Sequence, residues 1–155
     1  MDEAQLQLDG FLAKFSPEVE ALAQGLLEKM RRRVPGATIM VYDNYNALAI
    51  GFGSSHKVSR AVLSLAVYPR WVNLFFLHAA ALPDPQGRLR GTGSKVRHVR
   101  VLTVEALDDP AIDALIGAAM AASEPPFDPG AEARLIVKSI SARHRPRRPA
   151  DASVS

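Results

Sequence analysis

The most apolar stretch of the sequence, residues 60–77, constrains the fold more than any other feature. It contains two hydrophobic runs, 61–68 and 71–77, which are interrupted only by Ser64 and Asn73. Short runs that are rich in Val and aromatic residues are typical of strands buried in a sheet. We therefore expect two central strands here. The rest of the chain must cover them, either on both sides or along one face of the sheet.

Helical patterns lie on both sides of this central pair. Residues 2–15 place hydrophobic residues at helical spacing. Ser16 followed by Pro17 predicts the start of a second helix, because a hydroxyl N-cap and a proline in the first turn are both favoured there. Pro35 and Gly36 then end this helix. A third helix is expected to begin at 108–110 and to stop at the prolines of 125–126.

Shorter hydrophobic segments predict the remaining strands. Residues 38–42 and 47–52 are two candidates, and 97–102 alternates as a half-exposed strand at or near an edge does. Residues 135–140 could add a strand or dock along the core. Short connections favour an antiparallel meander. The predicted fold is therefore α+β, a two-layer sandwich with about five antiparallel strands and the N- and C-terminal helices packed on one face.

Composition limits the class of protein. A chain of 155 residues forms about one domain, and we predict a domain over 1–140. Residues 141–155 have nothing to bury and are expected to form a mobile basic tail. The absence of cysteine excludes disulfides and thiolate chemistry. The chain has no secretory signal pattern and no apolar run near the ~20 residues of a membrane span, so a cytoplasmic location without a membrane partner is expected.

A long polar loop at 82–97 is the strongest candidate for a binding site, because loops of this length in compact domains are often functional. Backbone N–H groups of a glycine-rich turn can surround an anion, and neighbouring cations add charge. The structural alternative is a tight loop that needs positive φ at two glycines. The predicted anion-binding residues are Arg88, Arg90, Gly91, Gly93, Lys95, Arg97 and Arg100.

Other candidate chemistry is less specific. Four aromatic residues could line a pocket between sheet and helices, although a role in the core is the alternative; they are Tyr42, Tyr45, Tyr68 and Trp71. The four histidines share no metal-ligand spacing, and no catalytic set of acid, base and nucleophile can be assembled. The arginines of 141–149 can hold phosphates, but aromatic residues do not alternate with them, so specific nucleic-acid binding is not expected.

The chain resembles the YdhG-like family, small bacterial domains largely without an assigned function. The likeness lies in VPGA at 34–37, AVYPRWVNLFFL at 66–77, the loop and strand of 82–101, and VKSISARHRPRRP at 137–149. The resemblance implies a frataxin-like α+β fold. Some members are described as frataxin-like iron chaperones, which implies iron binding through surface carboxylates. The candidates are Glu18, Glu20, Glu28, Asp108, Asp109 and Asp113.

Three functions therefore remain open at the level of the sequence. The first is a small binding module for an anionic or phosphorylated ligand at the glycine-rich basic loop. The second is the iron-binding chaperone that the resemblance implies; the residues themselves indicate no cofactor. The third is a protein-interaction domain whose partner could be a second copy, giving a homodimer. Enzymatic activity is not predicted.

Overall fold

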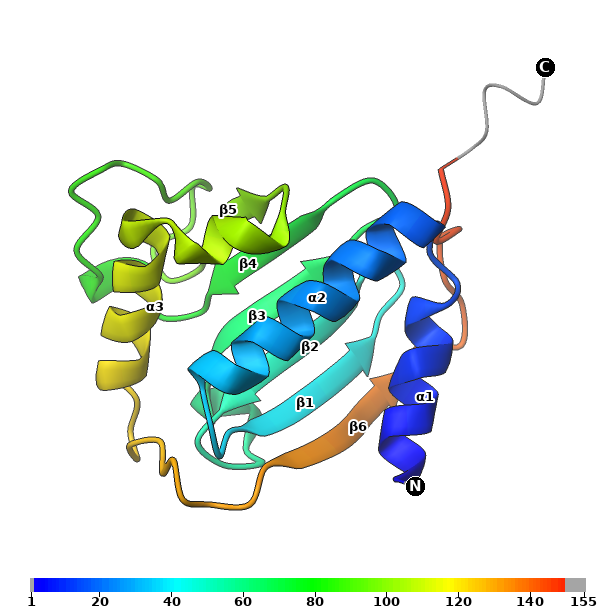
Figure 1. Ribbon diagram of the computed structural model, residues 1–155, viewed down its shortest axis with the longest axis horizontal. Coiled ribbons are helices and arrows are strands. Elements are labelled where there is room, and N and C mark those ends of the chain that lie inside the picture. The colour runs from blue at the N-terminus through cyan, green and yellow to red at the C-terminus, as the bar shows by residue number, and fades with distance from the viewer. Residues whose placement is uncertain (1, 150–155) are drawn as a thin grey trace.

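One six-stranded sheet with three α-helices on one of its faces forms the fold (Figure 1). The computed structural model describes residues 2–149. The elements are α1 (Glu3–Leu12), α2 (Pro17–Arg33), β1 (Thr38–Asp43), β2 (Leu48–Gly53), β3 (Ala61–Val67), β4 (Val72–Phe76), β5 (Arg97–Val101), α3 (Pro110–Ala121) and β6 (Arg134–Ile140). Three short 3-10 helices connect them, namely η1 (Val58–Arg60), η2 (Ala79–Ala81) and η3 (Val104–Asp108). The α+β class predicted from the sequence is confirmed.

The sheet has the order β5-β4-β3-β2-β1-β6. Strands β1 to β5 form the expected antiparallel meander, with β5 at one edge. The estimate of about five strands is one too low, because β6 joins the free side of β1 in a parallel pairing. The helix expected near the C-terminus, α3, is therefore followed by a strand. Between α3 and β6 the chain runs along one end of the sheet, at the bottom of the view in Figure 1. The end of β6 then lies beside the end of β1.

The helices cover the sheet face that carries its large aliphatic side chains. Paired residues Val41, Ile50, Leu65, Leu74 and Val99 form one row of this face, and all are buried. The predicted start of α2 is confirmed, since its N-cap hydroxyl accepts a hydrogen bond from the backbone N–H three residues later. Within residues 2–149, no helix is both long and apolar enough to cross a membrane.

The opposite face of the sheet has no helix over it in the part of the chain that the structure describes (Figure 1). Its middle row runs through Tyr42, Ala49, Ala66, Asn73 and Arg100. We call this the open face. In its centre Ala66 is buried and Ala49 is half-buried. Every residue of β3 is buried although helices cover only one side. Of the two arrangements left open by the sequence, the structure has cover along one face.

The segment after β6 is not the tail that the sequence predicted, as far as it is described. Residues 141–149 fold back along the end of the sheet, where the backbone N–H of Ser141 donates to the Asp43 carbonyl and that of Arg145 to the Tyr45 carbonyl. Arg147 is only 6% exposed. The expectation that this segment has nothing to bury is therefore wrong for 141–149, because a charged side chain finds a buried partner. Residues 150–155 of the predicted tail lie outside the described residues.

Candidate functional site

The arginine that opens the predicted anion-binding loop already has a partner. Arg88 Nη1 lies 2.8 Å from Oδ2 of Asp109, the N-cap residue of α3. This hydrogen bond, together with the backbone N–H of Ala111, lowers the pKa of the Asp109 carboxyl. Asp84 accepts hydrogen bonds from the backbone N–H groups of Arg88 and Leu89. The backbone at the start of the loop is thus held by Asp84, and the charge of Arg88 is balanced by Asp109.

The glycine-rich part of the loop is closed in a similar way. Arg90 Nη1 donates to the Gly87 carbonyl at 2.8 Å, and Arg97 Nε donates to the Gly93 carbonyl. Gly91 has the expected positive φ, +111°. The expectation of positive φ at Gly93 is wrong: a Cβ at Gly93 would lie 3.0 Å from the Val96 carbonyl oxygen, so close backbone approach is what requires a glycine there.

The predicted anion-binding residues are only partly brought together. Arg88, Arg90 and Arg100 line a cleft of ≈ 290 Å³ beside β5, but Asp109 lines the same cleft. The Arg100 guanidinium lies 4.3 Å from the centre of a tryptophan ring on the open face instead of pointing at a shared centre with the others. Lys95 is exposed, and its carbonyl accepts from the backbone N–H of Ala79.

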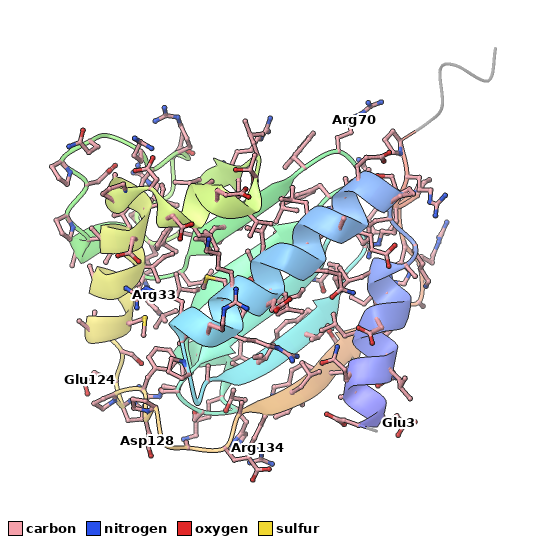
Figure 2. All side chains as sticks on the ribbon, in the orientation of Figure 1. Glu3, Arg33, Arg70, Glu124, Asp128 and Arg134 are labelled. Carbon is pink, nitrogen blue, oxygen red and sulfur yellow. The ribbon has the colours of Figure 1, made fainter. Side chains whose placement is uncertain are left out.

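A second, larger pocket lies at the end of the sheet where β1, β3 and β6 finish. Its volume is ≈ 750 Å³, and we call it the end pocket. The lining residues come from the β1–β2 turn, the β3–β4 turn and the C-terminal segment; they are Asn46, Tyr68, Pro69, Arg70, Trp71, Arg145, Pro146, Arg148 and Pro149. Figure 2 shows Arg70 at the outer tip of the β3–β4 turn. Among these lining residues three are arginines and none is acidic, so the electrostatic potential of the pocket is positive.

The C-terminal segment is held in place by a buried carboxylate. Asp43, at the end of β1, is 2% exposed, and its Oδ1 lies 2.9 Å from Arg147 Nη2. The same guanidinium donates to the backbone carbonyls of Asn44 and Tyr45, and His144 Nε2 is 3.1 Å from Asp43 Oδ2. This anchor fixes the backbone on both sides of Arg147, and it therefore places Arg145 and Arg148 at the end pocket.

Two of the four predicted pocket aromatics line the end pocket. Tyr68 and Trp71 are neighbours with ring centres 5.5 Å apart, and burial raises the pKa of the Tyr68 hydroxyl. Tyr45 is 48% exposed, and its ring centre lies 5.9 Å from the Arg145 guanidinium. Tyr42 projects from the open face, where burial raises the pKa of its hydroxyl. The structure thus brings two aromatic rings and three arginines together.

Sequence reasoning missed the arginines of this pocket. It placed Arg145 and Arg148 within the predicted tail, and it gave Arg70 no role. The apolar segment that forms β6 was the available signal. A strand there places the arginines that follow it at the end of the sheet. The partner strand of β6 is more than ninety positions earlier in the sequence, however, and no local pattern identifies it.

Four of the six carboxylates considered for iron form ion pairs with lysine or arginine. Asp108 pairs with Lys29 at 2.5 Å, Asp113 with Arg33 at 2.9 Å, and Glu28 with Arg32 at 2.9 Å. Asp109 is paired with the loop arginine described above. Over residues 2–149, no three His, Asp or Glu side chains are grouped closely enough to hold a metal ion. An iron ion at any of these four acids would have to displace a lysine or an arginine.

The fold and site together define an α+β two-layer domain with an arginine-lined pocket at one end of its sheet. No family model, curated protein or solved structure matches the chain. The residues that line the end pocket are therefore the basis for assigning a function.

Proposed function

We propose that this chain is a small binding module whose ligand is an anion held in the end pocket. The observation that supports it is the convergence of Arg70, Arg145 and Arg148 on one cavity whose described lining contains no acid. Arginine guanidinium groups bind carboxylates and phosphates through paired N–H donors, and they remain charged at all physiological pH values. A phosphate group suits this arrangement because several donors can reach its oxygens at once.

The size of the pocket agrees with a small ligand. Small-molecule sites usually have volumes of about 300–1,000 Å³ and combine apolar walls with a few polar groups. The end pocket, at ≈ 750 Å³, has aromatic rings and prolines as walls and arginines at its rim. Asn46 adds an amide that can donate or accept a hydrogen bond.

The proposal moves the anion site that the sequence suggested from the loop to the end pocket. In the cleft beside β5, an aspartate that is paired with Arg88 would repel an incoming anion. A ligand there would have to compete with this ion pair. In the end pocket, only Arg148 among the three arginines donates a side-chain hydrogen bond to another residue of 2–149, the carbonyl of Lys14 at 3.3 Å.

Isothermal titration calorimetry with inorganic pyrophosphate at low ionic strength tests the proposal. The double variant Arg70→Gln/Arg145→Gln should bind at least about tenfold more weakly than the unmodified chain, since each charge-assisted hydrogen bond contributes roughly 1.5–3 kcal/mol. The matched control is Arg32→Gln/Lys57→Gln, which removes the same charge from exposed positions away from the pocket. No binding by the unmodified chain, or an equal loss in the control, would contradict the proposal.

Membership of the YdhG-like family and a frataxin-like arrangement remain predictions. The feature that supports the arrangement is a set of helices on one face of a mostly antiparallel sheet. The predictions of a cytoplasmic location and of a protein partner, including a homodimer, have the same standing. A sedimentation equilibrium experiment over a range of concentrations would test self-association directly.

A further inference from the structure

We infer that the ligand of the end pocket carries a flat, hydrogen-bonding ring beside its anionic group, as a nucleotide does. This inference rests on the proposed function and adds the chemical class of the ligand. It comes from the position of Trp71, which lines the end pocket and directly precedes β4, whose Val72 and Leu74 side chains point into the core.

The surroundings of Trp71 form a stacking site. Tyr68 lies beside it with ring planes inclined by 31°, and the Arg100 guanidinium lies over its ring at 4.3 Å. Nucleobases stack on aromatic side chains and on arginine planes in the same way. Arg100 is exposed, so its side chain can move aside and leave the indole face to a ring from the ligand, or cover that ring from its other side.

Polar atoms beside this ring lack partners. Trp71 Nε1 and Asn73 Oδ1 are shielded from solvent, and neither has a hydrogen-bond partner in residues 2–149. Asn73 is only 6% exposed, and its place in the register directs it to the open face. Buried donors and acceptors without partners are rare in folded proteins because each lowers stability. The Nε1–H of Trp71 lies in the plane of the indole and points away from a ring stacked on its face, so it can serve another polar group of the ligand. Asn73, two positions along the chain, supplies an acceptor for the polar edge of the stacked ring.

The charges next to the ring favour an anionic ligand over a second copy of this face. The backbones of Arg90 and His98 form an antiparallel β-bridge at the outer edge of β5, and both residues lie near Arg100. Burial lowers the pKa of His98, and the two arginines lower it further. Two such faces would repel each other, whereas a phosphate-bearing ligand is attracted to them. A free nucleotide and a single-stranded nucleic acid share this chemistry.

Trp71 is the only tryptophan of the chain, so its fluorescence reports on the site directly. The titrants are pyrophosphate, ribose 5-phosphate, the four ribonucleoside monophosphates and a six-nucleotide single-stranded RNA. We expect at least one monophosphate to quench the fluorescence and to bind at least about tenfold more tightly than ribose 5-phosphate, because base stacking and edge contacts add to the phosphate contacts. Saturation by monophosphates alone identifies a free nucleotide. Much tighter binding of the RNA identifies a single strand.

Substitution of the ring separates this inference from the proposed function. Trp71→Leu, followed by calorimetry, should bring the affinities for monophosphate and ribose 5-phosphate together, and the ratio of these two affinities is the readout. Tyr45→Leu, an exposed aromatic outside the lining, is the control. If Trp71→Leu unfolds by circular dichroism, Trp71→Phe keeps a smaller aromatic ring without the Nε1 donor, and the preference for monophosphate over ribose 5-phosphate should be reduced. Pyrophosphate binding without any preference for a base would overturn the inference alone; failure of every titrant to bind would overturn the proposed function as well.

Discussion

The loop at 82–97 and the end pocket are both rich in arginine, but they differ in what their arginines contact. In the loop, Arg88, Arg90 and Arg97 donate to a carboxylate or to backbone carbonyls close by. In the end pocket, the side chains of Arg70 and Arg145 donate no hydrogen bond to any residue of 2–149. The cations of the loop therefore maintain a conformation, while those of the pocket are available to a ligand. The number of cations in a segment does not show which of these roles they have.

The largest expected effect concerns the anchor that creates this difference. Arg147→Ala removes one partner of a buried ion pair and leaves Asp43 buried without its cation, which should lower the free energy of unfolding by about 3–5 kcal/mol. Urea denaturation followed by circular dichroism measures the change. The control is Arg143→Ala in the same segment, an exposed residue whose loss should change stability by less than ~0.5 kcal/mol. Equal stabilities of the two variants would show that the segment is not anchored in this way.

The second prediction compares the two regions directly. Arg88→Gln/Arg97→Gln in the loop should change the affinity for pyrophosphate by no more than about twofold, because Arg88 is already paired with Asp109 and Arg97 donates to the Gly93 carbonyl of the loop. The pocket variant Arg70→Gln/Arg145→Gln removes the same charge and should reduce the affinity at least about tenfold. Calorimetry at 0.1 M salt distinguishes them. A larger loss in the loop variant would reverse the assignment of roles.

A smaller effect is expected from His98, beside the stacking site. Burial, followed by the nearby charges of Arg100 and Arg90, lowers the pKa of His98 below its usual 6.5. The unfolded chain therefore binds this proton more readily than the folded chain does. The contribution of His98 to stability is complete above about pH 6.5 and is lost as the pH falls toward the folded pKa. His98→Gln should make urea midpoints less sensitive to acid between about pH 7 and pH 5.

The matched control is His56→Gln, which removes a histidine at an exposed position. Titration of the His98 ring by NMR gives its pKa without a denaturant. A value at or above 6.5 would mean that the arginines and the burial around His98 have no net effect on its charge.

The smallest expected effect is a change in the pKa of Asp109 when its partner in the loop, Arg88, is replaced. The Arg88 hydrogen bond is the main cause of the lowered pKa of the Asp109 carboxyl. Arg88→Gln should raise this pKa toward its ordinary value of 3.8, as measured by carboxyl carbon shifts during an acid titration. Lys95→Gln, in the same loop, is the control and should leave the pKa of Asp109 where it is. An unchanged Asp109 in the Arg88 variant would show that this arginine is free to bind a ligand.

Much of the fold follows from local patterns, which explains why the sequence was informative. The capping residue Ser16, the turns and the apolar runs act over a few positions, so α2 and the meander of β1 to β5 were predicted with nearly their observed bounds. The parallel pairing of β6 with β1 was not predicted, because it joins segments that are distant along the chain. The partners Asp43 and Arg147 are 104 positions apart, and their contact depends on that pairing.

The same distinction between local patterns and distant pairings applies to the candidate site. Tyr68 and Trp71 were predicted to line a pocket between the sheet and the helices. They line a pocket at the end of the sheet instead, because they flank the β3–β4 turn. The arginines that complete the pocket come from a segment whose position depends on β6, so the sequence left them in a separate tail. The glycine-rich loop attracted attention because its residues are adjacent in the sequence. Its cations nevertheless have internal partners that only the three-dimensional arrangement brings into contact.

The central claim is that the end pocket, and not the loop, receives the anion, and NMR mapping tests it most directly. Backbone and arginine Nε–H signals of the unmodified chain are followed while pyrophosphate is added. The account predicts shifts concentrated at residues 45–46, 68–71 and 145–149, with the side-chain signals of Arg70 and Arg145 moving most. Shifts concentrated at residues 87–97, with the end pocket unchanged, would contradict it.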